Sequence, residues 1–192
     1  MRFRSSIIPE DTTYTAYSFP TVESGDACLL DSNILLRISK SHDLQHAAIS
    51  HALHELVGQG VRLCYTSQTL AEFWNASTRP LDKNGFGLNV AETDRLARVI
   101  ERDFEFLPDV REIHDRWRSL LVAHSIQGVQ VHDPRLAASM YVHGVGQLLT
   151  LGVRDFKRFQ ALRILQSGRI LWSTMSIFDG NWVSIVGADS KS

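Results

Sequence analysis

The chain has 192 residues, of which 44% are hydrophobic and 21% are charged. This is the size and apolar content of one compact domain, and it excludes a disordered or fibrous protein. Lys and Arg number 20 against 21 Asp and Glu, so the formal net charge is -1 and a histone-like polycation is excluded. The apolar stretches are too short for a membrane-spanning helix or a signal peptide, so we expect a cytoplasmic protein that does not contact a membrane.

The predicted organisation is one domain with two extensions. Residues 1–25 form an N-terminal extension, residues 26–172 form the domain, and residues 173–192 form a C-terminal extension. Cys28 and Cys64 each lie in a short apolar run, which favours buried thiols over a disulfide framework. Neither has a second Cys or a His at zinc-site spacing, which argues against a structural zinc site.

The first half of the domain alternates short apolar runs with helical patterns. Residues 27–30 are apolar and predict a buried strand that ends at Asp31, and residues 42–57 carry apolar side chains at helical spacing. A second strand is predicted over 61–65, followed by a helix that opens with the capping-box pattern Thr69-x-x-Glu72.

The second half continues this alternation. Asn89-x-x-Glu92 predicts the start of a helix that runs to about residue 104, and 109–125 is the most clearly amphipathic segment. We expect a helix from Asp133, at or near the N-cap, with Pro134 at its first position, and strands at 147–151 and 169–172. The pattern predicts an α/β domain with a mainly parallel sheet.

Acidic residues recur at the ends of predicted strands or at the helix starts that follow them: Asp31, Glu72, Asp133 and Asp155. Ligands of open α/β sheets bind beyond the carboxyl ends of the strands, so these carboxylates are expected to converge there. Two such charges about 4 Å apart repel by about 4 kcal/mol at an effective dielectric near 20, and a hard cation such as Mg²⁺ or Mn²⁺ compensates this repulsion. Helix capping alone is an equally good explanation of the three acids at helix starts, but it fits Asp31 less well.

The acidic residues lie in four segments that together resemble a known family. DSNILLR at 31–37, LAEFWNA at 70–76, VHDPRLAA at 131–138 and LLTLGVRDFKRF at 148–159 resemble, in order, the four acidic motifs of PIN-domain nucleases, and most closely the toxin ribonucleases of the VapC type. The resemblance implies a three-layer α/β/α domain with a small, mainly parallel central sheet. It also implies a metal-dependent endoribonuclease, the toxin of a type II toxin–antitoxin pair, with RNA as substrate, an antitoxin protein as partner, and a homodimeric state.

The resemblance also implies roles for individual residues. The four acids carry over as catalytic residues, with Asp31, Asp133 and Asp155 as ligands of one or two Mg²⁺ or Mn²⁺ ions and Glu72 as a ligand or the group that orients the attacking water. Asn33 and Thr150 are implied supporting residues. The family usually has Asn two residues after that Thr, whereas this chain has Gly152, so we expect a lost polar contact and a looser loop before Asp155.

Basic residues lie within a few positions of these motifs, and we interpret them as a rim that holds RNA phosphates; a solvated helix face is the alternative for each. They are Arg37, Arg79, Arg135, Arg154, Lys157 and Arg158.

Two other functions remain open at this point. One is a PIN-fold RNA-binding or interaction module with weakened catalysis, which Gly152 and the two extensions favour. The other is a PIN nuclease that processes RNA without an antitoxin.

Overall fold

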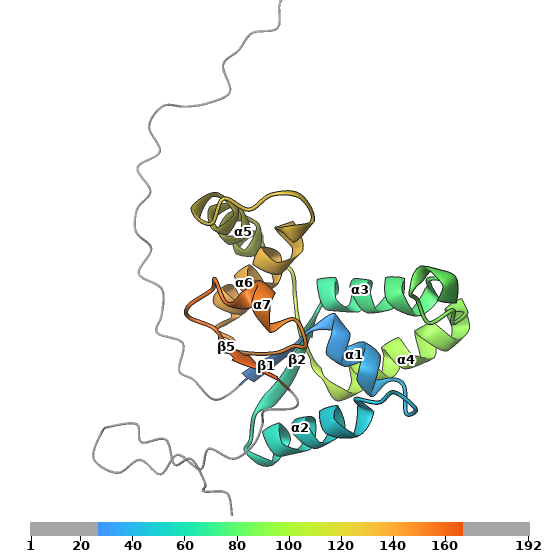
Figure 1. The fold of residues 1–192 in the computed structure, drawn as a ribbon. Helices are drawn as coiled ribbons and strands as arrows, with labels where there is room; N and C mark the ends of the chain where they lie inside the picture. Colours follow the sequence, from blue (N-terminus) through green and yellow to red (C-terminus); the bar gives the residue numbers. More distant parts are fainter. Residues whose placement is uncertain (1–26, 167–192) are drawn as a thin grey trace, which may run out of the picture.

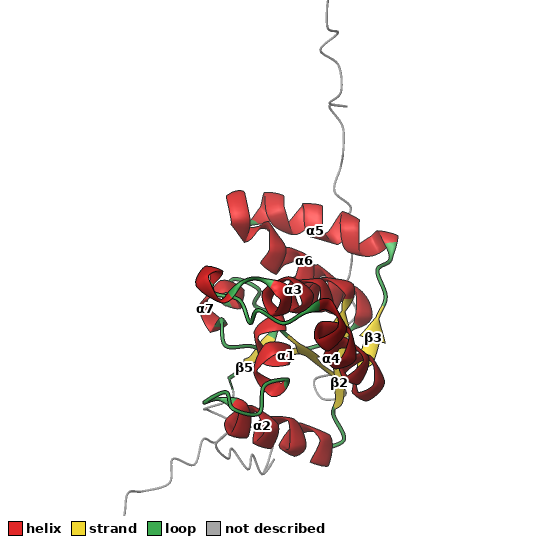
Figure 2. Ribbon diagram, turned by 90° about the vertical axis from the view of Figure 1, so that its right-hand side faces the viewer, coloured by secondary structure: helices red, strands yellow, loops and turns green. Residues whose placement is uncertain are grey.

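A computed structural model describes residues 27–166. Both predicted extensions and the strand predicted at 169–172 lie outside this range. The described chain folds into one five-stranded sheet with helices on both sides (Figures 1 and 2). No helix within residues 27–166 combines the length and the apolar character needed to cross a membrane.

The strands are all parallel and stand in the order β3-β2-β1-β4-β5. Their bounds are β1 Ala27–Leu30, β2 Arg62–Thr66, β3 Glu105–Leu107, β4 Gln147–Leu149 and β5 Arg163–Leu165. The chain runs outward from β1 through β2 to β3, then returns to the other side of β1 for β4 and β5. The strand order therefore reverses between β1 and β4, which is where open parallel sheets bind ligands.

Seven α-helices and two short 3₁₀ turns connect the strands: α1 Ser32–Ile38, α2 His46–Gly58, α3 Ser67–Thr78, η1 Leu81–Lys83, α4 Val90–Asp103, α5 Arg111–Ala123, η2 Gly128–Val131, α6 His132–His143 and α7 Val153–Phe156. The three-layer α/β/α architecture with a parallel sheet is confirmed. β3 and β5 are strands that the sequence did not predict, and α1, directly after Asp31, was also not predicted.

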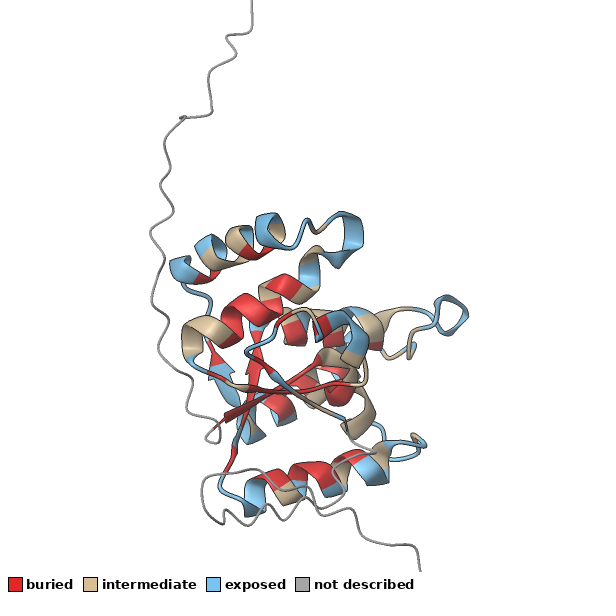
Figure 3. Ribbon diagram, turned by 60° about the vertical axis from the view of Figure 1, so that its left-hand side comes forward, coloured by how far each residue is buried: buried red, intermediate tan, exposed pale blue. Residues whose placement is uncertain are grey.

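Two hydrophobic cores lie on opposite faces of the sheet. Alternate residues of a strand point to opposite faces, so Leu29 and Cys64 pack against α5, α6 and α7, while Cys28 and Leu63 pack against the layer of α1 to α4. Figure 3 shows buried residues along the sheet and on the helix sides turned toward it. Both cysteines are free and buried, as predicted, and burial raises the pKa of the Cys28 thiol to about 12.

The predicted helix starts agree only in part with the N-caps that the structure shows. The predicted Asn89 cap is confirmed: its side chain accepts from the Glu92 backbone N–H, and the Glu92 carboxylate accepts from the Asn89 N–H. The cap predicted at Thr69 is wrong, because Thr66 is the N-cap of α3 and Thr69 is its reciprocal partner three residues later. At α6, Pro134 is the third helical residue and Asp133 the second, two positions further into the helix than a cap at Asp133 predicts.

Candidate functional site

Asp31 lies at the carboxyl end of β1, beside the point where the strand order reverses. It is only 8% exposed, and its backbone N–H donates to the carbonyl of Leu149 at the end of β4 (3.1 Å). Burial raises the pKa of the Asp31 carboxyl and the charge of Glu72 raises it further, while hydrogen bonds from Thr150 and Ser32 act in the opposite direction. A buried carboxylate at the end of an apolar strand is thus supported by neutral donors, and no Lys or Arg within residues 27–166 forms an ion pair with it.

Thr150 and Asn33 provide that support. The Thr150 hydroxyl donates to Asp31 Oδ2 at 2.6 Å, and the Asn33 side-chain amide donates to the same oxygen. Asn33 Nδ2 also lies 3.2 Å from Thr150 Oγ1, and Asn33 Oδ1 accepts from the Leu151 N–H (3.1 Å). The two predicted supporting residues therefore contact Asp31 directly and join the ends of β1 and β4.

Gly152 occupies the loop between Thr150 and Asp155. Its backbone N–H donates to Thr150 Oγ1 (2.9 Å), and its carbonyl accepts from the Asp155 N–H (3.1 Å). Hydrogen bonds of the Gly152 backbone thus hold the loop at the position where the resemblance predicts the side-chain amide of an Asn. A Cβ atom at position 152 would lie 3.1 Å from Asp155 Oδ2, so the absence of a side chain leaves room for that carboxylate.

Glu72 reaches the site from α3, in the first helical layer. Its Oε2 accepts from the Ser32 hydroxyl at 2.8 Å, and its Oε1 accepts from Gln68 Nε2 at 2.9 Å. The same Ser32 hydroxyl lies 3.3 Å from Asp31 Oδ1, so it stands between the two acids. Ser32 and Gln68 are site residues that the sequence reading missed; the available signals were the adjacency of Ser32 to Asp31 and the i, i+4 spacing of Gln68 and Glu72.

Asp133 and Asp155 come from the second helical layer, on α6 and α7. The pKa of Asp133 is raised from 3.8 to about 6, first by burial and then by the negative charges of Asp155, Asp31 and Glu72, against the positive charge of Arg158. The charges of the other three acids therefore all reach Asp133, which brings the four together at one edge of the sheet. As the side chains stand, no three or more His, Cys, Asp or Glu residues within 27–166 are arranged as a ready set of metal ligands.

Comparison with known proteins places this geometry in a known fold. No family model matches the sequence, and no curated protein matches it. Among solved structures, the chain is similar to VapBC2 from Rickettsia felis bound to a promoter DNA fragment, with 17% identity and a TM-score of 0.54 over 73% of this chain and 98% of that one.

Two further solved structures are similar over a comparable share of the chain. VapBC-1 from nontypeable Haemophilus influenzae has 20% identity and a TM-score of 0.53 over 74% of this chain and 99% of that one. A toxin–antitoxin complex from Klebsiella pneumoniae has 16% identity and a TM-score of 0.52 over 73% and 97%. The chain has a PIN-like fold.

In this PIN-like domain, half of the predicted basic rim is already engaged with other side chains. Arg37 forms an ion pair with Asp43 (2.8 Å), Arg135 forms one with Asp109 (3.0 Å), and Arg158 donates to the Gln130 side chain (3.3 Å). The other three predicted cations, Arg79, Arg154 and Lys157, make no ion pair with another described residue, and Arg154 and Lys157 are exposed.

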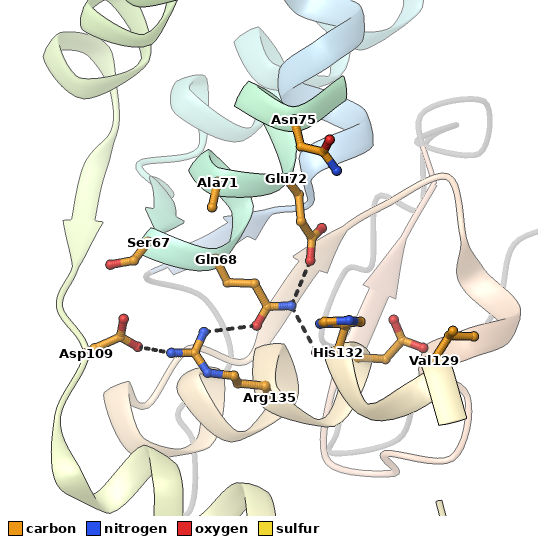
Figure 4. A pocket seen from close by; sticks show the side chains of 10 residues that line it. Ser67, Gln68, Ala71, Glu72, Asn75, Asp109, Val129, His132 and Arg135 are labelled. Atoms are coloured by element: carbon orange, nitrogen blue, oxygen red, sulfur yellow. Dashed lines mark hydrogen bonds and ion pairs between the residues drawn. The ribbon is translucent and has the colours of Figure 1, made fainter. Parts of the chain in front are cut away.

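A cavity of about 790 Å³ opens beside the acids, between α3 and the start of α6 (Figure 4). Eight of its ten lining residues have polar side chains: Ser67, Gln68, Ala71, Glu72, Asn75, Asp109, Val129, His132, Asp133 and Arg135. Two of the four acids, Glu72 and Asp133, therefore face a cavity of the size that small ligands occupy.

Proposed function

We propose that this protein is a metal-dependent endoribonuclease that hydrolyses RNA phosphodiester bonds. The observation that supports the proposal most strongly is the set of four carboxylates that reach one edge of a parallel sheet from β1, α3, α6 and α7. Their mutual repulsion contributes to raising the pKa of Asp133 to about 6. An all-oxygen, anionic donor set is what hard divalent cations such as Mg²⁺ and Mn²⁺ select.

In this proposal Asp31, Asp133 and Asp155 would hold one or two Mg²⁺ or Mn²⁺ cations. A bound Mg²⁺ or Mn²⁺ would lower the pKa of a water molecule and neutralise charge that develops on the phosphate. Thr150 and Asn33 fix the Asp31 carboxylate by hydrogen bonds to Oδ2. Cation binding would favour the ionised form of Asp133, because positive charge opposes the repulsion that raises its pKa.

Glu72 has a separate role in the proposal. Both of its carboxylate oxygens already accept a hydrogen bond from a neutral donor, Ser32 or Gln68. A carboxylate held in this way can orient a water molecule toward the phosphate by accepting a hydrogen bond from it, and can take its proton as the water attacks. No covalent nucleophile is needed.

We further propose an antitoxin partner. The similar structures from R. felis, H. influenzae and K. pneumoniae are VapBC or toxin–antitoxin proteins, and the similarity extends over nearly the whole of those chains. A second copy of the chain as partner stays a prediction from the resemblance.

The test is cleavage of a structured RNA by the purified protein with EDTA, Mg²⁺ or Mn²⁺, with Asp31→Asn as the inactivated variant. Asp82→Asn is the matched control, because Asp82 is exposed on η1 and lies outside the acidic site. We expect metal-dependent cleavage by the wild type and the control, and loss of cleavage in Asp31→Asn. Equal cleavage by wild type and Asp31→Asn, or no cleavage with any metal, would refute the proposal.

A further inference from the structure

Gln68 links the two helical layers of the domain across the carboxyl edge of the sheet. Its Nε2 donates to Glu72 Oε1 at 2.9 Å, within α3, and to the backbone carbonyl of His132 at 3.0 Å, at the start of α6 (Figure 4). Its Oε1 accepts from Arg135 Nη1 at 3.3 Å. One half-buried amide thus uses both of its N–H protons and its carbonyl oxygen.

The link matters because α3 and α6 belong to different cores. α3 packs with α1 and α4 on one face of the sheet, whereas α6 packs mainly against α5 on the other. The two hydrophobic cores therefore fix each helix relative to the sheet from its own face. The Gln68 amide joins the two helices one residue before Asp133, and it holds Glu72 at the same time.

The orientation of the Gln68 amide is itself fixed by an ion pair. Arg135 Nη2 contacts Asp109 Oδ1 at 3.0 Å, so the guanidinium is anchored beyond the end of β3 and presents Nη1 to Gln68 Oε1. With the oxygen turned toward Arg135, the amide nitrogen must face the Glu72 carboxylate and the His132 carbonyl. A reversed amide would place its NH₂ group against the guanidinium and its oxygen against a carboxylate.

We propose that Gln68 is a positioning residue that sets the Glu72 carboxylate relative to Asp133, with the Arg135–Asp109 ion pair orienting its amide. The proposal rests on the proposed nuclease function. In this proposal Arg135 acts by orienting Gln68, whereas the sequence predicted that Arg135 contacts RNA phosphate directly.

The kinetic test uses Gln68→Ala and Gln68→Glu. The ionised Glu side chain keeps the shape and the acceptor for Arg135, but it cannot donate to Glu72 or to the His132 carbonyl and it adds a negative charge beside Glu72. Losses of residues that orient a metal site typically reach 10–100-fold, so we expect kcat for RNA cleavage with Mn²⁺ to fall by about that factor, with KM changed less than about twofold. Gln59→Ala, at the exposed end of α2, is the matched control and should leave both constants unchanged.

A double-variant cycle separates positioning from direct RNA binding. If Arg135 acts through Gln68, Arg135→Met lowers kcat, and adding Arg135→Met to Gln68→Ala causes little further loss. If Arg135 binds RNA independently, Arg135→Met raises KM and the two effects multiply, which would overturn the assignment. Melting curves of all variants establish that they are folded, and a fall in activity that tracks loss of the folded state would also overturn it.

A measurement without RNA or metal tests the linkage itself. In the wild type, the side-chain amide protons of Gln68 should exchange with solvent more slowly than those of exposed Gln59 by ¹⁵N NMR, and Arg135→Met should accelerate that exchange. Fast exchange in the wild type overturns the positioning role whatever the activity. Slow exchange in a protein that cleaves no RNA instead refutes the proposed function and, with it, a catalytic consequence of the linkage.

Discussion

Asp133→Asn should stabilise the protein at neutral pH, even though Asp133 belongs to the candidate catalytic set. The pKa of this carboxyl is raised from 3.8 to about 6 by burial and by three neighbouring negative charges. Between these two values the folded state binds more protons than the unfolded state, so the stability of the wild type falls as pH rises from about 4 to about 6. Above that range the charged carboxylate imposes its full cost on the folded state, and a neutral amide of the same shape removes it.

The size of the effect follows from the pKa difference. At 1.36 kcal/mol per pKa unit, the change from 3.8 to about 6 corresponds to about 3 kcal/mol. Asp133 is only half-buried, and solvent screening reduces the expected gain to about 1–2 kcal/mol. For a chain of 192 residues this amounts to a rise in Tm of about 2–8 °C.

The assay is thermal unfolding followed by circular dichroism at pH 8 and at pH 4.5, with EDTA present so that no cation compensates the charge. We expect Asp133→Asn to melt above the wild type at pH 8 and most of that difference to disappear at pH 4.5. Asp82→Asn, an exposed substitution of the same chemistry, should show no such pH-dependent gain. A variant no more stable than wild type at pH 8, or a gain of equal size at both pH values, would refute the raised pKa that burial and the three neighbouring charges give Asp133.

Three further expectations concern the same edge of the sheet. Millimolar Mn²⁺ should raise the Tm of the wild type and not that of Asp31→Asn. A ligand that binds only the folded state stabilises it by about 2.7 kcal/mol at 100 times its Kd. No shift in the wild type would indicate that the four acids act only as separate helix caps. Gly152→Ala should displace the Asp155 carboxylate, 3.1 Å from the new Cβ, and weaken Mn²⁺ binding in a calorimetric titration. Gly58→Ala, where a Cβ meets nothing within 4 Å, should not weaken it. Thr150→Val should lower the free energy of unfolding in urea by about 1–3 kcal/mol, because Asp31 loses a buried donor; a loss below about 0.5 kcal/mol would contradict that role.

The sequence predicted those parts of the fold that leave a local pattern. The buried strand at 27–30 is a continuous apolar run because both faces of the sheet are covered, and the Asn89 cap has both of its partners within one turn. β3 and β5 have three residues each, and α1 has seven. Segments this short show neither the helical nor the strand periodicity of apolar residues clearly. They form because neighbouring strands and the core hold them in place.

The error at the start of α3 has a similar cause. Thr66 and Thr69 are both able to cap a helix, and the sequence favours Thr69 because Glu72 stands three residues later, as in a capping box. In the structure Glu72 is instead held by Ser32 and Gln68. A local motif and a tertiary site compete for the same carboxylate, and the sequence shows only the local motif.

The acids of the site were accessible to prediction because a parallel sheet brings the carboxyl ends of its strands to one edge. Their supporting contacts were less accessible, since the Thr150–Asp31 and Gln68–His132 hydrogen bonds join residues 119 and 64 positions apart. Such contacts depend on the relative placement of the two helical layers, which no local pattern encodes.

The near-zero net charge of the chain conceals a strong local imbalance at this edge of the sheet. Negative charge reaches it from both helical layers, and the Arg that lines the cavity, Arg135, is already paired with Asp109. The same repulsion that makes the folded state less stable at neutral pH would favour the proposed cation, because ion binding would relieve it. The charge of Asp133 therefore lowers stability but is needed for the proposed activity. Asp133→Asn is expected to increase the stability of the fold and to abolish RNA cleavage.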